Sequence, residues 1–224
     1  MVMLYYQLTT IASVIFMLIF AWRWLKNIDL GFTVSFILIP AINVGYLELA
    51  HAPDLSAALV ANKIIYLGGC FLNIFIMFGV LSLCHIKVSP IFRVGLLGLA
   101  SVLYAFVISI GRSELFYVSA DVETINGVTV LTNKVYGPVH IFFYVAAMVL
   151  VMGNIGITVY TFKNKPEISR NILWRIVVVT MIGFVAFFGG RAITNSIELM
   201  PLSYCILQFA YLIIFKRLRM YDLS

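Results

Sequence analysis

Ionisable side chains are scarce in this sequence of 224 residues, of which 11% are charged and 63% are hydrophobic. Glu48 and Lys63 stand out because each borders a long apolar stretch, with one short connection between them. A carboxylate or an ammonium group beside such stretches needs a partner, because an isolated charge there is energetically costly. The spacing favours a salt bridge between Glu48 and Lys63, with contact to a bound ligand as the alternative.

Polar residues with helical spacing continue from Lys63. Lys63, Tyr66, Cys70 and Asn73 occur at i, i+3, i+7 and i+10, which places them on one face of a helix. We expect this face to point into the protein, because it carries the polar groups of an otherwise apolar segment.

Two further lines of aromatic and polar residues lie later in the chain. One, with steps of four or eight residues, contains Tyr136, His140, Tyr144 and Met152. The other, if its helix continues past Gly189-Gly190, contains Phe184, Phe187, Phe188, Arg191 and Asn195. Aromatic stripes more often pack in a core than form a pocket. Our candidate ligand-binding residues, chosen for their charges, hydroxyls or imidazole, are Glu48, Lys63, Tyr66, His140, Tyr144 and Arg191.

The sequence lacks the residue patterns of catalysis and of metal or cofactor binding. The last apolar stretch has no lysine for a Schiff base, and there is no GxSxG motif, Gly-rich phosphate loop or pair of aspartates within an apolar stretch. The cysteines and histidines show no disulfide or metal-ligand spacing. These residues are Cys70, Cys84, Cys205, His51, His85 and His140. We therefore expect no enzymatic activity and no cofactor.

The elements that must position these residues are seven apolar stretches. Each is close to the roughly 20 residues that a helix needs to cross a bilayer. The sequence predicts an all-α membrane protein, a single seven-transmembrane helix bundle over residues 1–224. The stretches are Leu4–Trp24, Leu30–Glu48, Ala57–Cys84, Ile91–Ile110, Val139–Phe162, Ile172–Gly189 and Met200–Phe215.

The basic residues cluster in alternate gaps between these stretches and in the C-terminal tail. Basic residues favour the cytoplasmic side of a membrane, so we expect the N-terminus outside and the C-terminus in the cytoplasm. We interpret the formal net charge of +6 as anchoring the protein beside anionic lipid headgroups and not as binding nucleic acid. The clustered residues are Arg23, Lys26, Lys87, Arg93, Lys163, Lys165, Arg170, Arg175, Lys216, Arg217 and Arg219.

The longest gap, residues 111–138, is rich in β-branched and aromatic residues. Asn126-Gly127 in its middle is typical of the type I′ turn of a β-hairpin. We expect a small extracytoplasmic β-hairpin between the fourth and fifth helices, with an irregular loop as the alternative. In the second stretch, Pro40 predicts a kink near Phe36–Pro40.

Polar groups gather in the outer halves of the expected helices, whereas the inner halves are mostly Leu, Ile, Val and Phe. This asymmetry favours a cavity that opens to the outside over a continuous pore, although single polar residues also join helices together.

With its seven apolar stretches in this order, the sequence resembles the N-terminal seven-transmembrane sensor region of bacterial histidine kinases, which also occurs on diguanylate cyclases. The similarity covers essentially the whole chain. Three segments carry it: Glu48 to Lys63-Ile-Ile-Tyr66-Leu-Gly68, the hairpin closing with Tyr136-Gly137-Pro138, and the exit segment of the last helix. Within that exit segment, Lys216, Arg217, Arg219 and Asp222 are our candidate signal-output residues.

The resemblance implies a sensory input domain in the bacterial cytoplasmic membrane. It would perceive an unknown small-molecule or membrane signal and relay it through the seventh helix to a cytoplasmic histidine kinase or diguanylate cyclase, fused or separate, and could form a homodimer. The given sequence ends at Ser224, before such an effector. The alternatives are a small transporter or channel, or a non-catalytic assembly subunit.

Overall fold

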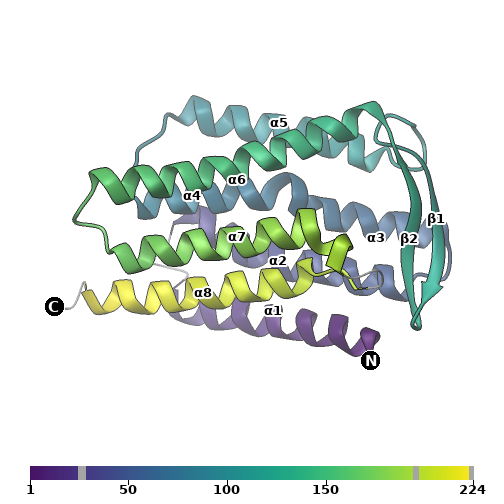
Figure 1. The fold of residues 1–224 in the computed structure, drawn as a ribbon, viewed down its shortest axis with the longest axis horizontal. Coiled ribbons are helices and arrows are strands. Elements are labelled where there is room, and N and C mark those ends of the chain that lie inside the picture. The colour runs from purple at the N-terminus through teal and green to yellow at the C-terminus, as the bar shows by residue number, and fades with distance from the viewer. Residues whose placement is uncertain (25–28, 194–196, 222–224) are drawn as a thin grey trace.

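The computed structural model describes residues 1–24, 29–193 and 197–221, with only the backbone of residues 191–193 and 218–221. Helices run back and forth along one long axis, so that the described N-terminus lies at one end of the bundle and the C-terminal helix leaves at the other (Figure 1). The helices are α1 Val2–Trp24, α2 Leu30–His51, α3 Leu55–Leu67, the π-helical η1 Gly68–Leu72, α4 Asn73–Leu83, α5 Pro90–Ile108, α6 Pro138–Asn164, α7 Arg170–Ile193 and α8 Met200–Tyr221.

Each predicted apolar stretch forms a helix or a continuous helical unit. Within the described residues, six of these are long and apolar enough to cross a membrane: α1, α2, the unit from α3 to α4, α5, α6 and α7. The seventh, α8, has 22 residues, with Lys216, Arg217 and Arg219 near its C-terminal end. The predicted boundaries differ by a few residues because polar caps and prolines start several helices earlier. The side chain of Asp54 accepts a hydrogen bond from the Ala57 amide, and Pro138 occupies the first turn of α6.

The sequence predicted the third span as one continuous helix. In the structure this span is not a continuous α-helix. Its middle turn, η1, is π-helical, and two glycines lie within it. A Cβ on Gly68 would overlap the side chain of Ile42, and one on Gly69 would lie 2.7 Å from Cζ of Phe143. The wide turn therefore fits against side chains of α2 and α6 only because these two positions carry none.

Pro40 lies inside α2, where it has no N–H to donate to the carbonyl of Phe36. Gln208 of α8 supplies a donor instead: its Nε2 lies 3.5 Å from that oxygen and 3.3 Å from the carbonyl oxygen of Ser13 in α1. The proline position thus becomes a point at which α1, α2 and α8 are joined.

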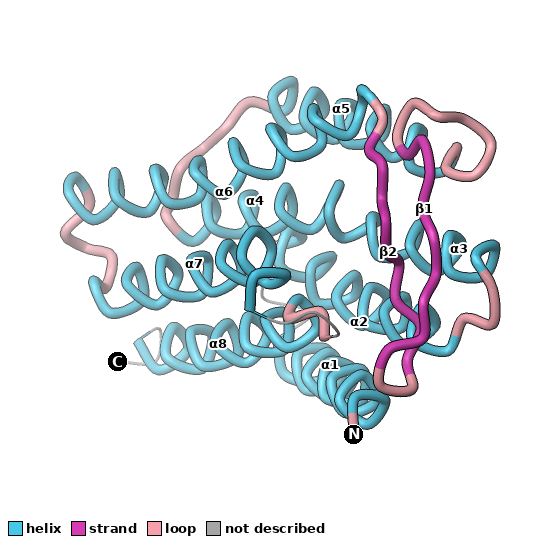
Figure 2. Tube along the Cα trace, turned by 45° about the vertical axis from the view of Figure 1, so that its right-hand side comes forward, coloured by secondary structure: helices cyan, strands magenta, loops and turns pink. Residues whose placement is uncertain are grey.

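The hairpin consists of β1 (Tyr117–Ile125) and β2 (Val128–Tyr136), which pair antiparallel. Both turn residues, Asn126 and Gly127, have positive φ angles of 54° and 77°, as a type I′ turn requires, so the predicted hairpin and its turn are confirmed. The hairpin lies across one end of the bundle (Figure 2). Its turn half contacts α2, where the Thr129 hydroxyl donates to the carbonyl of Ala52 over 2.7 Å.

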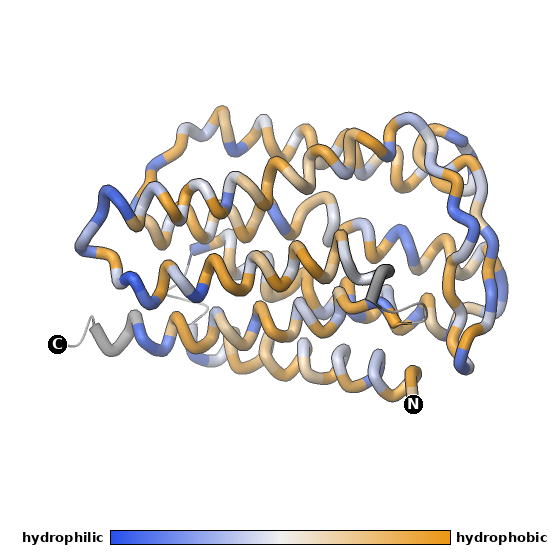
Figure 3. Tube along the Cα trace, in the orientation of Figure 1, coloured by the Kyte–Doolittle hydropathy of each residue, from blue (hydrophilic) through white to orange (hydrophobic). Residues whose placement is uncertain are grey.

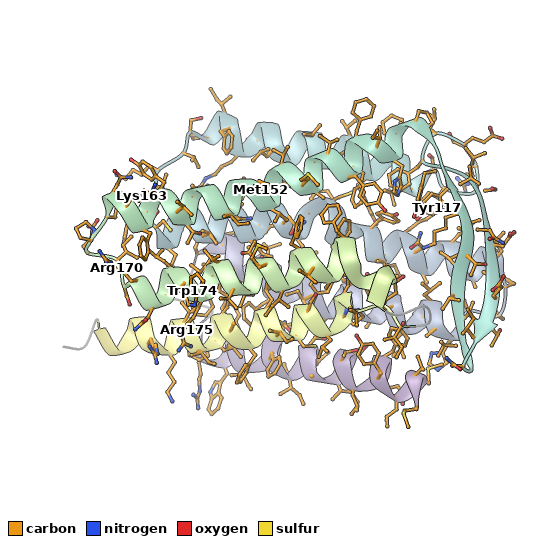
Figure 4. All side chains as sticks on the ribbon, viewed as in Figure 1. Tyr117, Met152, Lys163, Arg170, Trp174 and Arg175 are labelled. Carbon is orange, nitrogen blue, oxygen red and sulfur yellow. The ribbon has the colours of Figure 1, made fainter. Side chains whose placement is uncertain are left out.

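The two ends of the bundle differ in chemistry. Hydrophobic residues dominate the helices between the ends, and hydrophilic residues gather at the ends (Figure 3). Lys163, Arg170, Trp174 and Arg175 lie far from the strands, whereas Tyr117 belongs to β1 (Figure 4). We call these the basic end and the hairpin end.

An aromatic cluster fills the bundle toward the basic end. Phe20 of α1 stacks on Phe36 of α2 with ring centroids 4.3 Å apart, and Phe32 contacts Phe215 of α8 at 5.0 Å. Each of these four side chains is at most 2% exposed. The helices α1, α2 and α8 are therefore tightly packed on this side.

Candidate ligand-binding site

A cavity of about 380 Å³ lies at the hairpin end, between the helices and the strands. Nine of its sixteen lining residues are aromatic, and its walls come from α2, α3, η1, both strands, α6, α7 and the start of α8. The lining residues are Tyr46, Leu49, Asn62, Ile65, Tyr66, Gly69, Tyr117, Lys134, Tyr136, Phe143, Tyr144, Phe187, Phe188, Glu198, Met200 and Tyr204.

A hydrogen-bonded group of side chains joins the hairpin to the helices beside this cavity. The hydroxyl of Tyr66 in α3 lies 2.7 Å from the hydroxyl of Tyr117 in β1 and 3.0 Å from Nε2 of His140 in α6. Nδ2 of Asn62 also donates to the Tyr117 hydroxyl, over 3.4 Å. Tyr66 is thus the central member, because its hydroxyl contacts groups from two other elements.

The aromatic line predicted along the fifth span holds over its first three members. The ring of Tyr136 stacks on His140 with centroids 3.9 Å apart, and His140 meets Tyr144 edge to face at 4.6 Å. Tyr136 belongs to β2 and not to the helix, so the stack spans strand and helix. Tyr136 and Tyr144 line the cavity, whereas His140 packs between them and is not among the lining residues.

Met152 does not continue this line and is 58% exposed on the bundle surface (Figure 4). The prediction was wrong because residues spaced by four drift around a helix with 3.6 residues per turn. The twelve residues from His140 to Met152 rotate the side-chain direction by about 120°.

Two charged side chains, Glu198 and Lys134, line the same cavity, and each is partly buried. The backbone of Glu198 is fixed on both sides by α1: its carbonyl accepts a hydrogen bond of 2.9 Å from Tyr5, and its amide donates one of 3.1 Å to Tyr6. The residue that presents this carboxylate is therefore held in a defined place.

The structure brings only part of the predicted set together. Tyr66 and Tyr144 line the cavity, and His140, which is 1% exposed, lies directly behind its wall. Lys63 is partly buried and outside the lining, and Glu48 is exposed on α2.

The salt bridge expected between Glu48 and Lys63 is absent from the part of the chain that the structure describes. Arg191 lies in α7, but its side chain is outside the described residues. A ligand-binding role for any of the six residues stays a prediction.

Sequence reasoning missed the contributions of the strands and of the segment before α8. Tyr117, Lys134 and Glu198 line the cavity, yet none belongs to an apolar stretch with helical spacing. Tyr117 could have been found only by knowing that the hairpin folds back over the helices. Glu198 carried a signal, because it is a charged residue only two positions before the last apolar stretch.

A smaller cavity of about 60 Å³ lies next to the first and shares five lining residues with it, namely Gly69, Phe187, Phe188, Met200 and Tyr204. Asn73, Asn154 and Thr180 give it polar walls from α4, α6 and α7. Asn154 is 3% exposed, and its Oδ1 has no hydrogen-bond partner among the described residues. The two cavities meet beside the π-helical turn.

The predicted output residues lie at the basic end of α8. Lys216 is exposed and Arg217 is partly buried. For Arg219 only the helical backbone is described, and Asp222 lies outside the described residues.

In the described ranges, no group of three or more His, Cys, Asp or Glu residues could hold a metal ion. Cys70, Cys84 and Cys205 are buried and unpaired with one another. Hydrogen-bonding groups, aromatic rings and two opposite charges are thus what the cavity offers to a ligand.

Comparison with known proteins identifies the class of this bundle. The family model described as the N-terminal 7TM region of histidine kinase matches residues 7–224, nearly the whole chain. No curated protein and no solved structure matches the chain. The match and the apolar helices together make this a multi-pass membrane protein, and the matched region is the sensory input region of histidine kinases, not their catalytic part. The chain therefore belongs to the family of N-terminal seven-transmembrane regions of histidine kinases.

Proposed function

We propose that this domain senses an extracytoplasmic or membrane signal at the hairpin end and relays it through α8 to a cytoplasmic effector. The effector is a histidine kinase or diguanylate cyclase, fused to α8 or separate. The basic end faces the cytoplasm, because the alternate gaps and the C-terminal tail, in or beside which 11 of the 15 Lys and Arg residues of the sequence fall, belong to that side. The hairpin and the N-terminus then face outward, in the cytoplasmic membrane of a bacterium.

The observation that carries this proposal is the position of α8 relative to the cavity. Met200 and Tyr204, in the first turns of α8, form part of the cavity wall, and the same helix carries Lys216 and Arg217 near its other end, on the opposite side of the bundle. A ligand that contacts the first turns can favour one position of α8 over another. Only such a difference in affinity between two arrangements allows binding to change the output.

Contacts along α8 support a concerted movement with α1 and α2. Sγ of Cys205 donates to the carbonyl of Thr9 over 3.2 Å, and Nδ2 of Asn43 reaches the same carbonyl over 3.2 Å. One turn further, Gln208 contacts α1 and α2 as described above. A displacement of α8 must therefore displace or break contacts with both neighbours.

Packing favours a receptor over a channel. Phe20, Phe32, Phe36 and Phe215 fill the space between α1, α2 and α8 toward the basic end. A transport path through this region would require these rings to separate, at the cost of buried apolar contacts.

The test uses Tyr204→Ala in the chain joined in frame to a histidine kinase, with autophosphorylation in membrane vesicles as the readout. Removing a wall of the cavity shifts the balance between the two arrangements, and we expect the basal phosphorylation rate to change by roughly 5-fold or more, the lower range of allosteric coupling. The matched control is Leu202→Ala on the same turn, because Leu202 is 45% exposed and lies outside the cavity.

An unchanged rate for Tyr204→Ala, in protein that inserts and unfolds like the parent, would contradict the proposal. An equal change for Leu202→Ala would also contradict it, because the effect would then not come from the cavity. Uptake of solutes by vesicles that contain the chain alone would favour a transporter.

A further inference from the structure

We infer that the two neighbouring cavities form one elongated site for a neutral molecule with an aromatic or apolar body and a terminal hydroxyl or primary amide group. The cavity of about 380 Å³ at the hairpin end is the outer cavity, and the adjoining one of about 60 Å³ is the inner cavity. The inference rests on the proposed sensory function and specifies the chemistry of its ligand.

A buried amide group in the inner cavity is the first observation. The side chain of Asn154 lines this cavity and is 3% exposed, and its Oδ1 accepts no hydrogen bond from a described residue. The amide oxygens of Asn43 and Gln208 are also buried without a donor, but neither side chain lines one of these two cavities. Burial of an amide oxygen is costly unless a donor reaches it, so a ligand that supplies the donor binds favourably.

Two hydroxyls beside Asn154 offer acceptors as well. The Thr180 hydroxyl donates to the carbonyl of Ile176 over 2.8 Å, and the Ser203 hydroxyl donates to the carbonyl of Met200 over 2.8 Å. A hydroxyl has one proton to donate, so both oxygens present only lone pairs to a ligand. The inner cavity therefore requires a group that donates hydrogen bonds.

This donor group is neutral. No described residue that lines the inner cavity carries a formal charge, and a cation without a carboxylate partner is costly at membrane depth. A hydroxyl or a primary amide donates without carrying a charge. The side chain of Asn73 lines the same cavity and can donate in return to the oxygen of such a group.

The size of the inner cavity restricts it to one end of a ligand. Its volume of about 60 Å³ is far below the roughly 300–1,000 Å³ of cavities that hold whole ligands. It shares five lining residues with the outer cavity, where nine aromatic side chains provide walls for an aromatic or apolar body. Tyr66 lines the outer cavity, and Asn73 lines the inner one seven residues further along the third span. At 1.5 Å per residue they lie about 10 Å apart along the axis, the length of a ring with a short chain.

The experiment measures binding by calorimetry to the chain in lipid nanodiscs, with empty nanodiscs as the blank for partition into lipid. The probes share a phenylpropyl body and differ in the terminal group. They are 3-phenylpropanol and 3-phenylpropionamide as donors, the methyl ether of 3-phenylpropanol as an acceptor only, and 3-phenylpropylamine as a cation. We expect the alcohol or the amide to bind at least tenfold more tightly than the ether and the amine, because those two leave Oδ1 of Asn154 unpartnered or bring in a charge.

The variants test each end of the site. Asn154→Leu should bring the affinities of the donor probe and the ether within about threefold of each other, because the acceptor is lost. Tyr144→Ala in the wall of the outer cavity should weaken both probes about tenfold without changing their ratio, because apolar contact is lost. Asn164→Leu is the matched control, since Asn164 is exposed on the same helix as Asn154 and lies outside both cavities. Thermal unfolding verifies the fold of each variant, and the probe series on the parent chain does not depend on any variant.

Four outcomes would overturn the inference. No probe binds, so that the inner cavity holds water alone; the ether or the amine binds the parent chain as tightly as the donors; Asn154→Leu in folded protein keeps the preference for a donor; or Tyr144→Ala in folded protein leaves the affinity of the donor probe unchanged.

The kinase assay with Tyr204→Ala is independent of these probes. A shifted output without binding of the donor probes would leave the sensory function standing and reject the ligand class. Binding of a donor probe without any effect of Tyr204→Ala on output would do the reverse.

Discussion

At the scale of single residues, the side chain of Tyr66 makes the contacts that hold the hairpin against the helices. Its hydroxyl bonds Tyr117 of β1 and His140 of α6, and its ring meets Phe116 and Phe143 edge to face, with centroids 5.0 Å away in both cases. The hydrogen bonds and the ring packing can be separated, because phenylalanine keeps the ring and lacks the hydroxyl.

We predict that Tyr66→Phe lowers the free energy of unfolding by roughly 1–3 kcal/mol, because buried groups of Tyr117 and His140 lose a partner. Thermal unfolding in detergent measures the loss. Tyr160→Phe is the matched control, since Tyr160 is 55% exposed on α6 and should be neutral. Equal melting temperatures for Tyr66→Phe and the parent would show that these bonds do not hold the hairpin.

Some residues of the site could be predicted from the sequence and others could not. Tyr66, His140 and Tyr144 could be predicted, because helical periodicity shows which face of an apolar stretch is polar or aromatic. Lys134 and Tyr117 could not, because they reach the cavity from a hairpin whose placement depends on tertiary contacts. Glu48 was predicted in the site but is exposed, because proximity to a helix end does not determine the direction of a side chain.

At the scale of elements, α8 is joined to α2 at a backbone carbonyl that a proline leaves without its helical hydrogen bond. Pro40 leaves the Phe36 carbonyl without its helical donor, and Gln208 of α8 lies 3.5 Å from that oxygen. The sequence predicted a break near Phe36–Pro40, but it gave no sign that the partner would come from the last helix. That pairing requires α2 and α8 to be neighbours.

We predict that Gln208→Leu costs less stability in a Pro40→Ala background than in the parent, because the alanine supplies the helical N–H donor that the Phe36 carbonyl lacks. The difference, the coupling energy of a double-mutant cycle, should be about 0.5–1.5 kcal/mol. Equilibrium unfolding in detergent measures all four proteins.

A cycle of Gln208→Leu with Gly98→Ala is the control. A Cβ at Gly98 in α5 meets nothing within 4 Å, so this pair should show no coupling. If positions 208 and 40 also show no coupling, Gln208 does not donate an energetically significant hydrogen bond to the Phe36 carbonyl.

At the scale of the whole molecule, the bundle has two ends of different composition. The apolar helices and the two-stranded hairpin could be predicted from apolar length and turn residues, because these signals are local. The π-helical turn in the third span could not be, since it reflects the fit of Gly68 and Gly69 against α2 and α6. The membrane side of each end follows from charge alone and is open to a direct experiment.

We predict that Glu123→Cys in the hairpin reacts with a membrane-impermeant maleimide in intact cells, whereas Lys163→Cys reacts only after the membrane is permeabilised. Both positions are exposed, at opposite ends of the bundle. The parent chain is the background control, because its three cysteines are buried. The opposite labelling pattern would invert the proposed orientation.

The π-helical turn also determines how α4 is oriented. A π turn holds one residue more than an α turn, so its conversion to regular α-helix would rotate the residues beyond it by about 100° about the helix axis. Such a conversion would turn Asn73 away from the inner cavity and bring another side of α4 toward α6, with little change in the length of the span. A change of this one turn would therefore rotate α4 at the level where both cavities meet.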